Sequence, residues 1–143
     1  MNPGNIIIDS SVAAKWYLPD EKDINALKIK ADFTDKAILI TIPILFYYEV
    51  SNILKTTSKA LRISKEIVAI TYQDLLKLDF TVYYSNVLFK AALEKALELD
   101  ISSYDASYIA LAEYLEVPFY SADDRLIKKA NHKLVVHLKD YHK

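Results

Sequence analysis

Four acidic residues stand in unusual surroundings: Asp9, Glu49, Asp105 and Asp123. Asp9 and Asp123 each follow an apolar run typical of a buried strand, and a helix is expected directly after each of them. Asp105 falls in the first turn of an expected helix, and Glu49 falls within the apolar face of another. Rigidly mounted carboxylates favour a hard divalent cation such as Mg²⁺ or Mn²⁺ over zinc. Ions of this kind organise phosphate chemistry through one or two metals, so this is the chemistry the pattern favours.

The first of these residues, Asp9, ends the stretch Ile6–Asp9 and is followed by two serines. Three β-branched residues in a row predict a short strand that is buried on both faces. In open α/β sheets, ligands bind in the crevice beyond the carboxyl ends of such strands. The simpler interpretation, which stays open at this point, is that Asp9 or Ser10 only caps the next helix.

The most informative single residue is Glu49, because its helical neighbours are apolar. At about 100° per residue, Phe46 and Ile53 fall within roughly 60° of Glu49 on the helix surface. A buried ionised carboxylate is costly unless a cation or hydrogen bonds compensate it. A metal ion would do so. The alternatives are a partner such as Lys55, Arg62 or a backbone amide, or a side chain that reaches solvent at the helix end.

The remaining acidic positions each have an ordinary alternative. Asp105 in a first helical turn complements the helix dipole, although it shares its face with Ile109 and so points toward the core side. Asp123 and Asp124 are adjacent, and one of them is expected only to cap the helix that follows. Asp123 lies nearer the strand end and is therefore the predicted site residue, whereas a contribution of Asp124 stays open.

The elements that must position these residues alternate along the chain. Strands are expected at about 5–9, 37–41, 80–84, 117–121 and 134–138. Helices are expected at about 10–18, from 19 onward, 43–58, 64–78, 87–99, 102–115 and 124–130. In the helix opening at Pro19, residues Ile24, Leu27, Ala31 and Phe33 are expected inside, and in the helix at 64–78, Ile67, Val68, Tyr72, Leu75 and Leu76. The pattern predicts one α/β domain over residues 1–143, with three α/β/α layers around a mostly parallel sheet.

Composition excludes several classes of site. A single glycine leaves no Gly-rich phosphate loop, and the absence of cysteine excludes disulfides, zinc–thiolate sites and cysteine nucleophiles. No signal peptide or membrane-spanning stretch is recognised, so a cytoplasmic protein is expected. The net charge of −1 is unlike that of proteins that hold nucleic acid tightly through phosphates. Any contact with nucleic acid is therefore expected to be brief, metal-assisted or confined to a local basic patch.

Four segments together resemble the PIN domain, and especially the VapC-type toxins of prokaryotic toxin–antitoxin pairs. They are Ile7–Val12, Tyr48–Asn52, Leu99–Ala112 and Pro118–Asp123, of which the third is the most specific. Each contains one of the four acidic residues, and the similarity extends over nearly the whole chain. Ser121 stands where threonine is commoner, which keeps the hydroxyl group.

The resemblance implies a three-layer fold and a metal-dependent endoribonuclease. Asp9, Glu49, Asp105 and Asp123 would hold one or two Mg²⁺ or Mn²⁺ ions, and Ser11, Asn52 and Ser121 would orient carboxylates or water. The ion would activate a water molecule in line with a phosphodiester bond of RNA. The family also implies a homodimer, with the helix pair at about 43–79 as a reasonable surface, and a VapB-type antitoxin whose tail covers the site.

Two other functions remain open. One is a non-catalytic PIN-like scaffold that binds RNA or protein, although all four acids are present. The other is an aspartate-based phosphotransfer or phosphatase domain built on Asp9. Phosphatases of that kind need a second aspartate two residues later, where this chain has Ser11. Substituting Asp105 by asparagine separates a nuclease from a scaffold.

Overall fold

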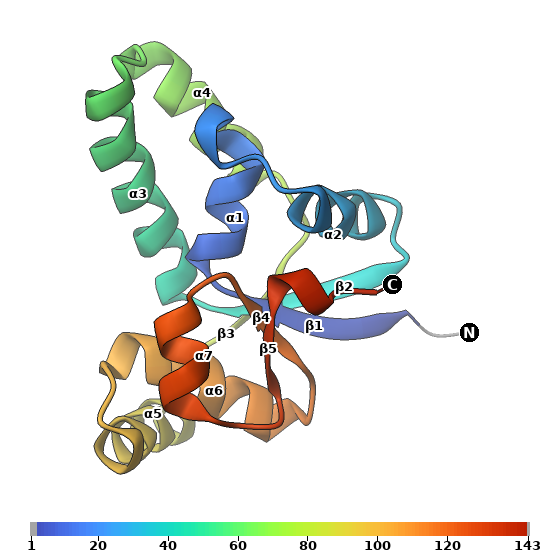
Figure 1. The fold of residues 1–143 in the computed structure, drawn as a ribbon, viewed down its shortest axis with the longest axis vertical. Coiled ribbons are helices and arrows are strands. Elements are labelled where there is room, and N and C mark those ends of the chain that lie inside the picture. The colour runs from blue at the N-terminus through green and yellow to red at the C-terminus, as the bar shows by residue number, and fades with distance from the viewer. Residues whose placement is uncertain (1–2, 143) are drawn as a thin grey trace.

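A five-stranded sheet lies at the centre of the computed structural model, which describes residues 3–142 (Figure 1). All neighbouring strands run parallel, and their spatial order is β3-β2-β1-β4-β5. The strands are β1 (Gly4–Ile8), β2 (Ile38–Pro43), β3 (Thr81–Tyr83), β4 (Phe119–Ser121) and β5 (Val135–His137). The central strand β1 is the buried isoleucine run predicted from the sequence, and Ile7 and Ile8 are fully buried.

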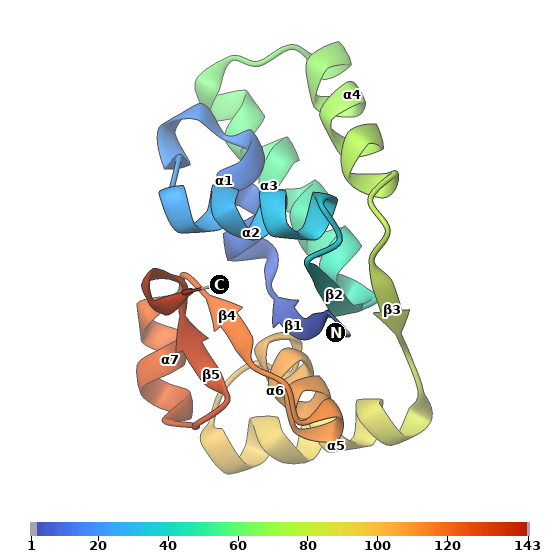
Figure 2. The ribbon, with the colours of Figure 1, turned by 90° about the vertical axis from the view of Figure 1, so that its right-hand side faces the viewer.

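Helices cover both faces of this sheet. They are α1 (Ser10–Tyr17), α2 (Ile24–Thr34), α3 (Leu45–Leu61), α4 (Lys65–Leu76), α5 (Asn86–Leu99), α6 (Ser103–Leu115) and α7 (Asp124–Ala130). Figure 1 shows α1 and α2 on one side of the sheet and α5, α6 and α7 on the other, while α3 and α4 form a hairpin that extends beyond it (Figure 2). The predicted three-layer α/β/α class is therefore confirmed. Within residues 3–142, no helix is long and apolar enough to cross a membrane.

The strand order reverses at β1, and this reversal determines where a ligand can bind. From β1 the chain moves outward through β2 to β3, then returns to place β4 and β5 on the opposite side of β1. The helices that begin after β1 and after β4 leave from opposite faces of the sheet (Figure 1). A parallel sheet opens a crevice at such a reversal, beyond the carboxyl ends of the two strands. Here that point lies between the ends of β1 and β4.

The second helix begins later than predicted. Pro19–Glu21 is a short 3₁₀ turn. Helix α2 begins only at Ile24, because Asp23 is its N-cap: the carboxylate of Asp23 accepts hydrogen bonds from the backbone amides of Asn25 and Ala26. This start places Ile24 and Leu27 toward solvent, with 83% and 43% of their surface exposed. The predicted inner face is therefore wrong except at Phe33. The buried residues of α2 are Ala26, Ile29 and Phe33.

The central helix pair also differs in detail. Pro43 is the last residue of β2, pairs with Tyr83 of β3 and does not lie in a helix, which begins at Leu45. Within α4, only Leu75 is buried, while Ile67 and Leu76 are more than half exposed. The physical reason is that α4 packs mainly along α3 and extends beyond the sheet, so only a narrow face is covered (Figure 2).

Candidate active site

The four predicted acidic residues come from four elements that converge at the carboxyl end of the sheet. Asp9 is the N-cap of α1, Glu49 lies in the second turn of α3, Asp105 lies in the first turn of α6, and Asp123 is the N-cap of α7. Their charges act on one another. Asp105 raises the pKa of Asp9 and of Glu49, and Asp123 raises the pKa of Asp105. The four carboxylates therefore share one electrostatic field, with Asp105 as the common neighbour.

The carboxylate of Asp9 is the most firmly held of the four. It is 6% exposed. Its Oδ1 accepts hydrogen bonds from the backbone N–H of Ser11, at 3.1 Å, and from the Ser11 hydroxyl. Its Oδ2 accepts a 2.6 Å hydrogen bond from the hydroxyl of Ser121. Burial raises the pKa of Asp9 to about 6, against the opposing effect of these hydrogen bonds. Asp9 is thus both a helix cap and a member of the acidic group.

Ser11 and Ser121 connect the ends of β1 and β4 through Asp9. The Ser11 hydroxyl also accepts a 3.0 Å hydrogen bond from the backbone N–H of Ala122, and the Ser121 hydroxyl accepts one of 3.1 Å from the N–H of Asp123. Both serines were predicted to lie near the carboxylates, and the structure brings both onto Asp9. Ser121 is fully buried, so water cannot replace the hydrogen bonds of its hydroxyl. The two serine hydroxyls therefore hold the ends of β1 and β4 together.

The half-buried carboxylate of Glu49 has a tyrosine as its partner. The hydroxyl of Tyr108 donates a 2.6 Å hydrogen bond to Glu49 Oε1. Tyr108 is buried and stacks on Phe119, with ring centroids 5.3 Å apart and planes 17° apart. Burial raises the pKa of Glu49, while the hydrogen bond from Tyr108 lowers it. Burial and the charge of Glu49 raise the pKa of Tyr108 well above its usual range, so its hydroxyl remains a donor.

Tyr108 is the site residue that sequence reasoning missed. The partners that the sequence suggests for Glu49 are Lys55, Arg62 or a backbone amide, and Tyr108 is not among them. A signal was present, because Tyr108 follows Asp105 by three residues and so lies on the same side of its helix. The side chain of Tyr108 thus both packs on Phe119 and donates a hydrogen bond to Glu49.

Asp105 and Asp123 line the open side of the site. Asp105 is half-buried, and its backbone N–H donates a 3.0 Å hydrogen bond to the N-cap hydroxyl of Ser102. Burial is the main cause that raises the pKa of Asp105. Asp123 is exposed, and its Oδ1 caps α7 by accepting a 3.0 Å hydrogen bond from the N–H of Leu126. The cap is therefore Asp123 itself, while Asp124 lies 2.9 Å from Nε2 of His137.

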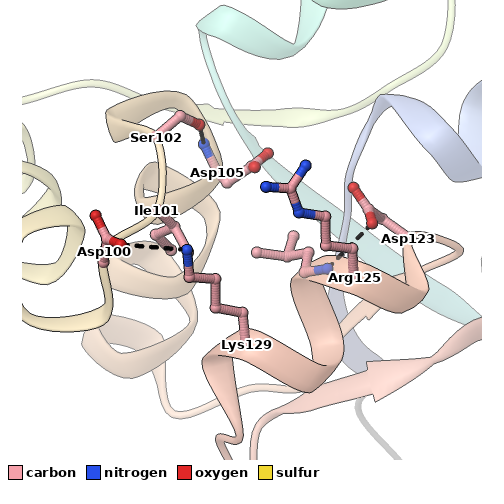
Figure 3. A pocket seen from close by; sticks show the side chains of 8 residues that line it. Asp100, Ile101, Ser102, Asp105, Asp123, Arg125 and Lys129 are labelled. Atoms are coloured by element: carbon pink, nitrogen blue, oxygen red, sulfur yellow. Dashed lines mark hydrogen bonds and ion pairs between the residues drawn. The ribbon is translucent and has the colours of Figure 1, made fainter.

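Two hollows adjoin the carboxylates. The first, of about 280 Å³, is shown in Figure 3 and is lined by Asp100, Ile101, Ser102, Asp105, Asp123, Arg125, Leu126 and Lys129. The second is lined by Leu45, Tyr48, Glu49, Asn52 and Tyr104. Asn52 is exposed and lies one helical turn after Glu49, next to the site as predicted. Asp105 and Asp123 therefore border one hollow and Glu49 the other.

The residues present fit a hard divalent cation. All donors in the group are carboxylate or hydroxyl oxygens, and burial raises the pKa of three of the carboxylates, an effect that a bound cation would oppose. Across residues 3–142, no three acidic or histidine side chains form a ready-made ligand set. Mg²⁺ commonly keeps several waters and is held by only one or two carboxylates, so an open set of this kind suits it.

The fold and the site together define a doubly wound α/β protein with an acidic, cation-compatible site at the reversal of its sheet. The family model described as the PIN domain matches residues 6–132, and the chain belongs to the PIN domain family. Its fold is similar to the crystal structure of PAE2754 from Pyrobaculum aerophilum, with a TM-score of 0.69 and 20% sequence identity. That similarity covers 97% of this chain and 92% of the other. No curated protein matches the sequence significantly. PIN domains are commonly nucleases, which indicates that the site acts on nucleic acid.

Proposed function

We propose that the chain is a metal-dependent endoribonuclease that hydrolyses phosphodiester bonds of RNA. The observation that supports this most strongly is that four carboxylates lie close enough at the reversal of the sheet for the charge of one to raise the pKa of another. They are those of Asp9, Glu49, Asp105 and Asp123. Four carboxylates from distant parts of the chain are kept together at an electrostatic cost. A divalent cation offsets that cost and is the usual partner of such groups in phosphate chemistry. Mg²⁺ or Mn²⁺ is the proposed cofactor.

Each side chain then has a distinct task. Asp9, held by Ser11 and Ser121, and Glu49, held by Tyr108, form the rigid part of the ligand set. Asp105 and Asp123 face the hollow through which RNA approaches (Figure 3). When bound, the ion supplies a water of lowered pKa and a positive charge beside the scissile phosphate. Carboxylates whose pKa is raised, such as Glu49 and Asp105, accept a proton more readily than exposed ones.

The direct test is cleavage of single-stranded RNA by the purified protein with Mn²⁺ or Mg²⁺, compared with EDTA. Asp105→Asn should abolish metal-dependent cleavage, because it removes the carboxylate that is coupled to the other three, while circular dichroism and melting temperature stay close to wild type. Asp124→Asn is the matched control, since Asp124 pairs with His137 instead, and it should cleave normally. Equal activity of wild type and Asp105→Asn would contradict the proposal. Binding of RNA without cleavage would favour the scaffold.

We further infer, from the motifs shared with VapC-type sequences, that the chain is the toxin of a toxin–antitoxin pair. Its partner would be a VapB-type protein whose tail covers the carboxylates. Expression of the wild type in a bacterial host should arrest growth, and Asp105→Asn should not. Co-expression with the gene next to it should restore growth. Normal growth with abundant, folded wild-type protein would contradict the toxin assignment.

A homodimer is the proposed assembly. The helix pair α3–α4 carries exposed apolar side chains that a partner copy would cover, among them Ile67, Ile70 and Leu76. Ile70→Glu should therefore convert dimers to monomers in sedimentation equilibrium, whereas Glu66→Ala on the same helix should not. A monomeric wild type at micromolar concentration would contradict this assembly.

A further inference from the structure

Helix α7 turns two basic side chains toward the hollow that contains Asp105 and Asp123. Arg125 and Lys129 are four residues apart, so they lie on one face of the helix, and both line the hollow. Figure 3 shows the guanidinium of Arg125 reaching toward Asp105 and lying between it and Asp123. Lys129 lies farther along the helix, with its Nζ 3.4 Å from Asp100 Oδ2. The hollow therefore leads from carboxylates to cations.

Neither Arg125 nor Lys129 has a strong ion-pair partner among the described residues. In the described part of the chain, Arg125 forms no ion pair, although it lies beside two carboxylates. The partner of Lys129 is almost completely exposed, and an exposed pair of this kind contributes little to stability. A guanidinium presents several N–H donors in one plane, an arrangement that matches two oxygens of a phosphate. These groups are thus available to a ligand that carries phosphate.

The charge of the hollow depends on whether a cation is bound. Asp100, Asp105 and Asp123 outnumber Arg125 and Lys129 by one, so the protein alone presents a net negative charge there. Asp9 and Glu49, which would share the ion, add two further negative charges at the inner end of the hollow. One divalent ion at the carboxylates therefore lowers the excess of negative charge from three to one, so that a phosphate at Arg125 and Lys129 meets much less repulsion.

We propose that Arg125, with Lys129 behind it, binds a backbone phosphate of the RNA next to the phosphate that is cleaved. This inference rests on the proposed ribonuclease function and adds a subsite to it. In a chain with a net charge of −1, Arg125 and Lys129 place two cations beside the path of the strand. Two phosphates, one at the carboxylates and one at Arg125, fix the strand across the site.

The binding test compares Arg125→Ala, Lys129→Ala and Arg125→Lys with the control Lys128→Ala, which lies on the same helix, is exposed and does not line the hollow. Binding of single-stranded RNA is measured in Ca²⁺ at several salt concentrations, and the RNA is recovered afterwards to show that it is intact. Arg125→Ala should weaken binding by about tenfold and reduce the slope of log K against log salt by about 0.7, the value for one phosphate contact to a single strand. Arg125→Lys should keep the slope and part of the affinity, and Lys128→Ala should match the wild type.

A chemical experiment locates the contact. RNAs in which one phosphate at a time is replaced by a neutral methylphosphonate should lose affinity for the wild type at the position that Arg125 contacts. At that same position, and at no other, Arg125→Ala should lose nothing further. Equal losses for wild type and Arg125→Ala at every position would overturn the proposed subsite.

The outcomes separate this subsite from the ribonuclease proposal. If the wild type cleaves RNA and requires Asp105, but Arg125→Ala and Lys129→Ala equal Lys128→Ala in binding and in KM, the subsite is wrong and the nuclease stands. If Asp105→Asn cleaves like the wild type, the nuclease mechanism fails, and the methylphosphonate series still decides the subsite. Omission of the divalent ion should reduce the difference between Arg125→Ala and wild type, and an unchanged difference would contradict the proposed dependence of phosphate binding on the ion.

Discussion

The hydroxyl of Tyr108 donates a 2.6 Å hydrogen bond to Oε1 of Glu49, a residue 59 positions earlier in the chain. This contact joins α6 to α3 at the edge of the acidic site. It lowers the pKa of Glu49, which burial and the charges of Asp9 and Asp105 raise. Tyr108 therefore opposes the rise in the pKa of Glu49 and orients its carboxylate, although its own ring is buried against Phe119.

Replacing Tyr108 by phenylalanine should weaken the site without unfolding the protein. The ring still packs on Phe119, but Glu49 loses its donor, so its pKa rises and its orientation relaxes. Affinity for Mn²⁺ should fall by about tenfold, as is usual when the partner of a metal ligand is removed. The deficit should grow as the pH is lowered, because more Glu49 becomes protonated. Metal titrations at several pH values measure both effects. Tyr114→Phe, which changes an exposed tyrosine of the same helix away from both hollows, should behave as wild type.

Ser121 is expected to be needed for its hydroxyl group. Ser121→Ala leaves Asp9 Oδ2 without its donor and the N–H of Asp123 without its acceptor, both near the buried strand end. The free energy of unfolding should fall by about 1–3 kcal/mol, the usual cost of unsatisfied buried polar groups. Urea denaturation checks this. Ser121→Thr retains the hydroxyl and should lose much less; an equal loss in both variants would show that packing, not hydrogen bonding, is responsible.

The pKa of Asp9 predicts how stability depends on pH in the absence of metal. It is raised from 3.8 to about 6 in the folded protein, so the folded state binds the proton more tightly than the unfolded state. The contribution of Asp9 to the free energy of unfolding is therefore largest below about pH 4, falls as the pH rises to about 6, and is constant above that. For this one group the change is at most about 3 kcal/mol. Asp9→Asn should remove this component from the denaturation profile, whereas the exposed Asp79→Asn should not.

Divalent metal should stabilise the folded protein through the same group of carboxylates. An ion that binds only the folded state at 100 times its Kd adds about 2.7 kcal/mol, which raises the melting temperature by several degrees. The shift should nearly vanish in Asp9→Asn and remain in Asp124→Asn. Thermal melts with Mg²⁺, Mn²⁺ and EDTA provide the comparison. Equal shifts in wild type and Asp9→Asn would show that the ion binds elsewhere.

Much of the architecture followed from local pattern. The isoleucine run before Asp9, the apolar run before Asp123 and the alternation of strands and helices predicted the parallel three-layer fold, which the structure confirms. The resemblance of the four motif segments to the PIN domain is confirmed as well, because the family model matches residues 6–132. The assignment of Asp9, Glu49, Asp105 and Asp123 as ligands stays a prediction.

The remaining errors arose where tertiary contacts override local pattern. Asp23 starts α2 one turn after Pro19, so the inner face of that helix is rotated and Ile24 is exposed. Pro43 extends β2 because it pairs with Tyr83 of β3. The strand at 80–84 was predicted, but its pairing with Pro43 could not be found from the local pattern of either segment. The partner of Glu49 could not be found from α3 alone, since Tyr108 comes from a helix that packs there only in the folded chain.

The hydroxyl bridge between Ser11, Asp9 and Ser121 also affects when the site forms during synthesis. Asp9 emerges early, yet its Oδ2 has no donor until Ser121 has been translated and β4 has docked beside β1. Pairing over this separation is a late, non-local step in folding. A nascent chain therefore lacks an assembled set of carboxylates for most of its translation. Under the proposed ribonuclease function, cleavage would begin only after β4 has brought Ser121 and Asp123 to Asp9.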